Sequence, residues 1–160
     1  MTTPPSLLHG DVAEGDTLPE LTHDVTATTV VLGALASRDW RPMHHDFKFA
    51  TERNGVQDIF LNTPNLAAWF ERYVTDWTGP HGRLGRMTFR MGDSVFPGNR
   101  MVIRGTVTGT SVDDDGCGWA DVEIALTADD RPCCSCSCRV ALPTDPDDNP
   151  WARRGDAWRP

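Results

Sequence analysis

The nine-residue stretch RDWRPMHHD, residues 38–46, gathers two aspartates, two histidines and two arginines around one proline. Within it, Asp39 and His44 are separated by four residues, one of which is Pro42. Proline ends regular helix, so the stretch is predicted to form a turn that directs a carboxylate and an imidazole toward one point. Such a pair suits acid–base chemistry on water, because one group accepts a proton while the other orients the water or returns the proton.

The same residues also permit a purely structural role. In that alternative Asp39 caps a turn through its own backbone and His44 is an ordinary surface residue, and the stretch alone is compatible with both readings. In a functional pair, an imidazole titrates near neutrality and burial is expected to raise the pKa of Asp39. His45 is interpreted as a spacer and Asp46 as the start of the next helical segment. No second cluster of ligands has a matching spacing, so we predict no metal.

These residues must be positioned by the elements around them, of which one helix is the clearest. In LNTPNLAAWFERYVTDWTGP, residues 61–80, Thr63 can cap the helix and Pro64 suits its first position. Large apolar side chains fall on one stripe at helical spacing: Leu66, Trp69, Phe70, Tyr73 and Trp77. This stripe favours core packing over a ligand site, and its aromatic rings require a broad apolar surface such as a sheet.

The start of this helix is a second candidate for chemistry. Backbone N–H groups at a helix start carry partial positive charge and can hold a developing oxyanion. Pro64 has no N–H, so the available donors are those of Asn62, Thr63 or Asn65. The ordinary alternative is that these amides meet water or the helix cap.

The second half of the chain supplies a sheet. Residues 85–92, 99–112, 118–128 and 131–143 alternate in the manner of strands, and acidic turns at 113–116 and 129–130 predict that the last three form an antiparallel meander. A shorter helix is predicted over 26–37. One long helix and a meander indicate an α+β fold in which an antiparallel sheet wraps around one long central helix.

Four of the five cysteines lie in RPCCSCSCRV, residues 131–140. Strand alternation places Cys134, Cys136 and Cys138 on one face, without the turn that usually lets zinc ligands converge. We interpret these cysteines as small apolar residues that face the core or the helix, rather than as a metal or redox site.

Composition limits the partners and the organisation. The chain has 160 residues and a formal net charge of -8, which argues against nucleic acid or an anionic membrane as a main partner. Its start lacks the pattern of a signal peptide, so a cytoplasmic protein is expected. Residues 1–15 are expected to be a flexible lead-in and residues 16–143 the domain. Residues 144–160 form a proline-rich, charged tail, expected to be mobile alone unless Trp151 and Trp158 dock on a neighbour.

RDWRPMHHD resembles the D-x-N-P-x-H signature of the MaoC-like, (R)-specific enoyl-CoA hydratases, which have the hotdog fold. MTFRMGDSVFPGNRMVIRGTVTG, residues 87–109, is similar to a later segment of that family, in which a PG turn joins two strands. Within the family, HHD, DIFLN and ERYVTDWTGP resemble the small catalytic subunits of the actinobacterial heteromeric hydratases that act on steroid side-chain CoA thioesters.

The resemblance implies roles for five residues. Asp39 matches the catalytic aspartate and His44 the catalytic histidine that activate water for addition to a 2-enoyl thioester. Phe60, Leu61 and Asn62 match the substrate-binding helix start, where Asn62 takes the place of a glycine whose N–H faces the thioester oxygen. The resemblance implies no cofactor, because coenzyme A is part of the substrate.

The resemblance also implies a partner: a homodimer, or a heterodimer or heterotetramer with a second MaoC-like hotdog subunit.

The sequence departs from the family at Arg41, where asparagine is usual, and in lacking the HG pair at the helix start. Two alternatives therefore stay open, a non-catalytic hotdog subunit that shapes a partner's acyl-CoA pocket and an acyl-CoA thioesterase. The cations Arg83, Arg86, Arg100 and Arg104 could meet the phosphates of coenzyme A or be ordinary surface charges.

Overall fold

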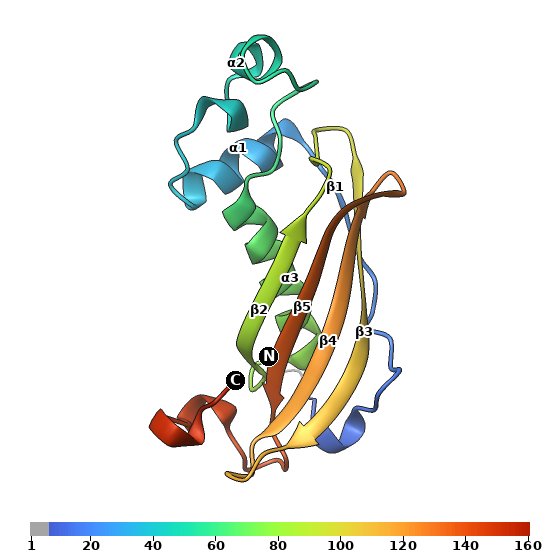
Figure 1. The fold of residues 1–160 in the computed structure, drawn as a ribbon, viewed down its shortest axis with the longest axis vertical. Coiled ribbons are helices and arrows are strands. Elements are labelled where there is room, and N and C mark those ends of the chain that lie inside the picture. The colour runs from blue at the N-terminus through green and yellow to red at the C-terminus, as the bar shows by residue number, and fades with distance from the viewer. Residues whose placement is uncertain (1–6) are drawn as a thin grey trace, which may run out of the picture.

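A curved five-stranded antiparallel sheet wraps around helix α3, Thr63–Thr78, in the computed structural model, which describes residues 7–160 (Figure 1). The strand order is β1-β3-β4-β5-β2. The strands are β1 Leu21–Asp24, β2 Arg83–Met91, β3 Arg100–Val112, β4 Gly118–Ala128 and β5 Arg131–Leu142. The predicted α+β arrangement is therefore confirmed.

The meander of β3, β4 and β5 forms because acidic turns connect its strands. At the first turn, the Asp113 carboxylate accepts hydrogen bonds from the backbone N–H of Cys117 at 2.8 Å and from the indole N–H of Trp119 at 2.8 Å. At the second turn, Asp129 and Asp130 adopt φ values of 47° and 64°, a left-handed conformation that aspartate tolerates better than most residues. Both turns lie where the sequence predicts them.

Helix α3 begins one residue earlier than predicted. Its N-cap is Asn62, whose side-chain oxygen accepts from the backbone N–H of Asn65 at 3.2 Å, so Thr63 and Pro64 occupy the first two helical positions. Asparagine caps a helix at least as well as threonine, which explains the shift. The helix ends at Gly79, whose φ of 74° is accessible to glycine at little cost.

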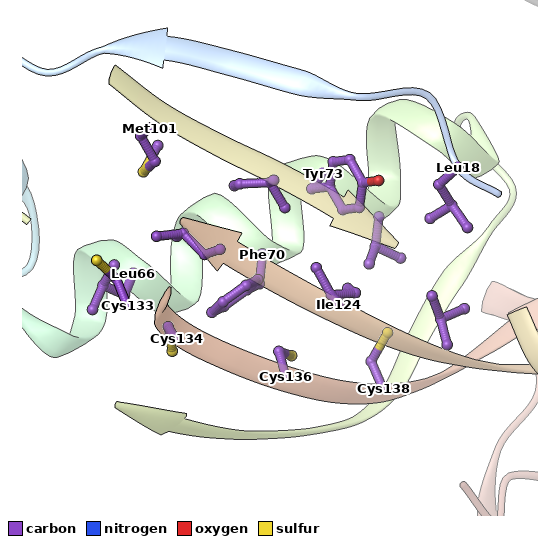
Figure 2. Close-up of a cluster of buried hydrophobic side chains, with 14 of the residues drawn as sticks. Leu18, Leu66, Phe70, Tyr73, Met101, Ile124, Cys133, Cys134, Cys136 and Cys138 are labelled. Carbon is purple, nitrogen blue, oxygen red and sulfur yellow. The ribbon is translucent and has the colours of Figure 1, made fainter. Parts of the chain in front are cut away.

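The core lies between α3 and the inner face of the sheet (Figure 2). The predicted helix stripe faces this core: Leu66, Phe70 and Tyr73 are buried, while Trp69 and Trp77 are partly buried. Opposite them, the cysteines of β5 point inward from the strand. Burial raises the pKa of the Cys136 and Cys138 thiols to about 12, so both are neutral, small core side chains, as interpreted from the alternation.

Both ends of the described chain pack on the domain, and residues 7–15 are therefore not the flexible lead-in that the composition predicts. Residues 7–15 pack beside the sheet: the Leu7 N–H donates to the Thr78 carbonyl at 3.1 Å, and the His9 N–H donates to the Pro143 carbonyl at 2.8 Å. These bonds are made by backbone groups alone, so the amino-acid composition of the segment does not predict them. The rest of the expected lead-in, residues 1–6, lies outside the described residues.

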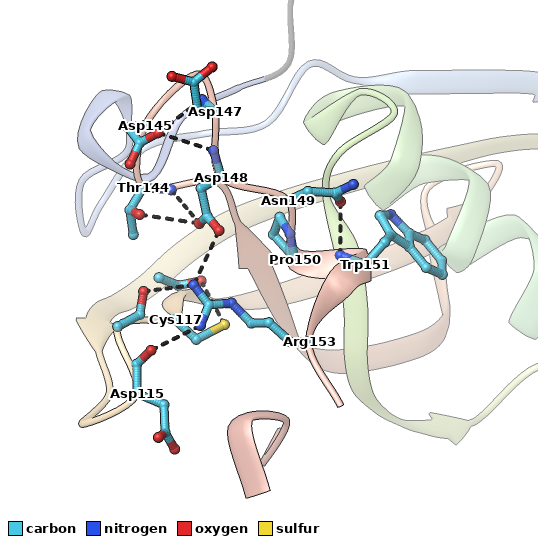
Figure 3. Close-up of polar contacts among 12 residues, drawn as sticks. Asp115, Cys117, Thr144, Asp145, Asp147, Asp148, Asn149, Pro150, Trp151 and Arg153 are labelled. Carbon is cyan, nitrogen blue, oxygen red and sulfur yellow. Dashed lines mark hydrogen bonds and ion pairs between the residues drawn. The ribbon is translucent and has the colours of Figure 1, made fainter. Parts of the chain in front are cut away.

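The tail docks on its own domain: the Arg153 guanidinium donates to the Asp115 carbonyl at 3.0 Å and to the Asp148 carboxylate at 3.2 Å (Figure 3). The Trp158 ring packs on Trp119 with centroids 5.1 Å apart. The Arg83 guanidinium lies 3.5 Å from the centroid of the Trp158 ring and donates to the carbonyls of Pro150 and Arg153. Aromatic and cation–π contacts therefore order a segment whose composition alone suggests mobility.

Three short elements cover one end of the sheet, above the start of α3 (Figure 1). They are α1 Ala27–Ala36, the 3-10 turn Pro42–His44 and α2 Phe47–Glu52. Thr26 caps α1, and Asp46 caps α2 at the helix start that the sequence predicts. No helix among residues 7–160 has both the length and the apolar character needed to cross a membrane.

Candidate active site

The chain between α1 and α2 brings Asp39 and His44 together. After α1 it turns through Arg38, which has a φ of 54°, and the Asp39 N–H donates back to the Ala34 carbonyl at 2.9 Å. Pro42 then opens the 3-10 turn that ends at His44. The Oδ2 atom of Asp39 lies 3.5 Å from Nε2 of His44, and the two side chains are 9% and 4% exposed. The structure thus brings a largely buried carboxylate and a buried imidazole close together.

The orientation of the His44 ring is fixed from the other side. Its Nδ1 atom lies 2.9 Å from the carbonyl oxygen of Phe60, which can only accept, so Nδ1 carries the hydrogen. The Phe60 ring packs edge-on against the imidazole with centroids 4.9 Å apart. Nε2 is therefore the nitrogen that faces Asp39, and in the neutral ring it carries the free lone pair.

The Asp39 carboxylate is held by two neighbours. The Arg41 guanidinium donates from Nε to Oδ1 at 3.1 Å and from Nη2 to Oδ2 at 3.4 Å, while the Asn62 amide donates to Oδ2 at 3.0 Å. The Arg41 bond is the largest influence and lowers the pKa of Asp39 from its usual 3.8 to about 2, against the opposing effect of burial. The expectation that burial raises this pKa was wrong, because the charged donor outweighs desolvation.

Asn62 links three parts of the site. Its side-chain oxygen caps α3, while its NH₂ group donates to the Ser37 hydroxyl at 2.8 Å as well as to Asp39. Ser37 follows the last residue of α1, so one buried amide ties the end of α1 to the start of α3. The sequence pattern points to Asn62 only through its backbone N–H, and neither this side-chain role nor the part of Ser37 in the site is predicted from it.

A cavity of about 190 Å³ opens beside these residues. Its lining includes His44 and all three residues predicted to bind substrate, Phe60, Leu61 and Asn62, together with the apolar side chains of Met43, Leu66 and Val95. Arg41 and Asp93 are its charged residues. A wall with the polar side chains of His44 and Asn62, facing apolar side chains, is typical of a site that positions water beside an apolar ligand.

The residues at the start of α3 line this cavity and carry backbone N–H donors. The Asn65 N–H is occupied by the Asn62 side chain and the Leu61 N–H by the Val95 carbonyl. Within residues 7–160, the backbone N–H groups of Asn62 and Thr63 have no acceptor, and both residues line the cavity. Of the three predicted donors, these two can therefore hold an oxyanion.

Two of the candidate phosphate-binding cations are engaged elsewhere. Arg83 is enclosed by the tail, as described above, and Arg104 forms an ion pair with Glu20 at 2.6 Å. Neither Arg86 nor Arg100 lines the cavity. Among the residues that the structure describes, the only arginine in its lining is Arg41, which the sequence singled out solely as a departure from the family pattern.

Comparison with known proteins places the chain among hydratases. No family model matches the sequence. Over 94 residues, 59% of this chain, it is 36% identical to the 3-oxo-4,17-pregnadiene-20-carboxyl-CoA hydratase beta subunit of Mycobacterium tuberculosis, and the match covers 72% of that protein.

Solved structures agree with this relationship. A chain of the ChsH1-ChsH2 complex from Mycobacterium tuberculosis superposes with a TM-score of 0.73 and 28% identity, covering 81% of this chain and 98% of that one. The MaoC-like dehydratase from Rhodospirillum rubrum superposes with a TM-score of 0.76 over 88% of this chain and 99% of that one, at 16% identity, and so supports the fold alone.

Proposed function

The chain belongs to the MaoC-like hydratases of hotdog fold, and we propose that it adds water across the 2,3 double bond of a bulky, steroid-derived 2-enoyl-CoA. The observation that carries the proposal is the sheltered pair of Asp39 and His44, 3.5 Å apart. His44 lines the cavity together with Asn62 and Thr63, whose backbone N–H groups have no acceptor within residues 7–160. Hydration of an enoyl thioester needs both features.

In the proposed reaction, a water molecule sits between the carboxylate and the imidazole. One group takes a proton as the oxygen bonds to C3, and the electrons of the double bond move toward the thioester carbonyl. The N–H groups of Asn62 and Thr63 stabilise the negative charge that develops on the thioester oxygen, and one such donor typically contributes about 3 kcal/mol in the transition state. Return of the proton to C2 completes the addition and leaves the thioester intact.

The steroid part of the proposal is supported by the 36% identity to a hydratase of 3-oxo-4,17-pregnadiene-20-carboxyl-CoA. The cavity of about 190 Å³ in this chain is small beside the roughly 300–1,000 Å³ of typical ligand pockets. A polycyclic acyl group therefore requires surface from a second subunit.

A second hotdog subunit is part of the proposal for two reasons. The structural relative is a chain of a complex between two different proteins, ChsH1 and ChsH2. In addition, β2 is a nine-residue edge strand that pairs only with β5 within residues 7–160, so its other edge is available to a partner. We propose a heteromer in which the partner extends the sheet and completes the acyl pocket.

Reconstitution tests the proposal. This chain, a candidate second hotdog subunit and their mixture are each assayed for loss of the ultraviolet absorbance of a steroid 2-enoyl-CoA, and a thiol reagent follows free coenzyme A. We expect hydration only in the mixture, without thiol release. Hydration by the partner alone, unchanged on addition of this chain, would make it an accessory subunit, and thiol release would make it a thioesterase.

A further inference from the structure

Arg41 holds both oxygens of the Asp39 carboxylate. Its side chain donates to Oδ1 and Oδ2, and its backbone N–H also donates to Oδ1 at 3.3 Å. The guanidinium is itself 64% exposed, so it reaches from the solvent side onto a carboxylate that is 9% exposed. Planar two-point contacts of this kind fix a carboxylate in orientation as well as in charge.

Two other groups face Asp39, and one of them is a further hydrogen-bond donor. From the start of α3 comes the uncharged amide of Asn62, and from the 3-10 turn comes the imidazole of His44. Within the described residues, Arg41 and His44 are the titratable side chains that face the carboxylate. The second charged residue of the cavity lining, Asp93, is paired with Arg131 at 3.1 Å. The Arg41 guanidinium and the Asn62 amide therefore both donate to Asp39.

This arrangement gives the two members of the pair unequal chemistry. A carboxylate whose oxygens already receive three side-chain hydrogen bonds is a weak proton acceptor, although it can still accept a hydrogen bond from water. The Nε2 atom of His44 has no such donor, because the hydrogen-bonded nitrogen is Nδ1. The geometry thus separates a group that orients water from a group that can deprotonate it.

This inference rests on the proposed hydratase activity. We propose that Arg41 is a positioning residue that keeps Asp39 as a fixed, ionised water-orienting group, so that Nε2 of His44 performs the proton transfer. The water proton passes to Nε2, the hydroxyl oxygen bonds to C3, and the electron pair of the double bond shifts to the thioester enolate. The imidazolium then delivers the same proton to C2, so that H and OH are added and the histidine is regenerated.

Arg41 variants test this assignment in the reconstituted complex. Arg41→Met removes the guanidinium and Arg41→Lys keeps the charge but not the fork, while Arg72→Met is the matched control, because Arg72 pairs with Asp76 outside the cavity. Carbon NMR of the Asp39 carboxyl is expected to move its pKa from about 2 toward the usual 3.8 in Arg41→Met, with a smaller change in Arg41→Lys and none in Arg72→Met.

The kinetics separate positioning from substrate binding. We expect kcat of Arg41→Met to fall about tenfold or more with little change in KM. We also expect the activity of this variant to fall more steeply than that of the wild type as pH falls through about 4, because Asp39 then becomes protonated. A raised KM with unchanged kcat would instead make Arg41 a contact for the coenzyme A phosphates. A lower melting temperature with an unchanged Asp39 titration and kcat would make it merely structural. Either result overturns the inference.

Failure of this inference and failure of the proposed function remain distinguishable. The NMR titration needs no substrate, so it reports the hold of Arg41 on Asp39 even in an inactive complex. An inactive wild-type complex would overturn both the hydratase proposal and the assignment of proton transfer to His44. If the complex is active and Arg41→Met changes neither its kcat nor its pH profile, only the role proposed for Arg41 is overturned.

Discussion

The side-chain amide of Asn62 donates to the Asp39 carboxylate at 3.0 Å, although 23 positions separate the two residues in the sequence. The same amide group donates to Ser37, and the oxygen of the same side chain caps α3. One buried side chain therefore fixes both the start of the central helix and the orientation of the candidate catalytic carboxylate.

Substitutions at Asn62 should separate these two contributions. Asn62→Ser keeps an N-cap oxygen but is too short to reach Asp39, whereas Asn62→Ala loses both contacts. We expect kcat to fall in both variants, while the free energy of unfolding falls by about 1 kcal/mol more in Asn62→Ala than in Asn62→Ser. Urea unfolding and steady-state kinetics measure the two effects. Equal stability of the two variants would contradict the capping role.

Asp39→Asn should abolish most hydration while the fold survives. The substitution keeps the shape of the side chain but removes the charge that orients water beside His44. We expect turnover of a 2-enoyl-CoA to fall about 100-fold or more in the reconstituted complex, with an unchanged near-ultraviolet circular dichroism spectrum. The control is Arg72→Met. Wild-type turnover in Asp39→Asn would remove the basis of the proposed function.

The pKa of Asp39 predicts a loss of stability in acid. This pKa is about 2 in the folded chain and ordinarily 3.8, so the folded state favours the ionised form. The resulting stabilisation is fully present above about pH 4 and is lost as pH falls toward 2. The difference in unfolding free energy between the wild type and Asp39→Asn should therefore shrink by about 1–2 kcal/mol between pH 5 and pH 2.5. A constant difference over this range would contradict the lowered pKa.

The docked tail should contribute to stability. Trp158 packs on the buried Trp119 and carries the Arg83 guanidinium on its face. We expect Trp158→Ala to lower the free energy of unfolding by about 1–3 kcal/mol. Phe47→Ala, which truncates an aromatic side chain that is 58% exposed, should change it by no more than about 0.5 kcal/mol. Similar losses in the two variants would show that the tail is not held by its tryptophan.

The sequence predicts the elements whose signals are local. The alternation of the three meander strands, the acidic turns between them and the apolar stripe of α3 each lie within one segment, and all were found where expected. The spacing of Asp39 and His44 around Pro42 left both a paired site and a structural turn open, and the structure brings the two side chains to 3.5 Å. Periodicity and proline chemistry act over a few residues, so they can be read from a single sequence.

What the sequence does not predict depends on contacts between distant segments. Strand β1 has only four residues and is defined by its pairing with β3. The tail is ordered by Trp119 and Arg83, which lie far from it in the chain, and the pKa of Asp39 is set mainly by a guanidinium that the sequence identifies only as a departure. Pairing or packing with a distant segment decides each of these features, and local pattern does not determine it.

The buried cysteines have one more consequence. All five are free, all are buried, and desolvation raises the pKa of each thiol, so the native chain offers an oxidant almost no thiolate to attack. Sulfur chemistry at these positions must then wait for a transient opening of the domain. Oxidised protein in an ageing preparation would accordingly record how often the molecule has opened, and not how strong the oxidant was.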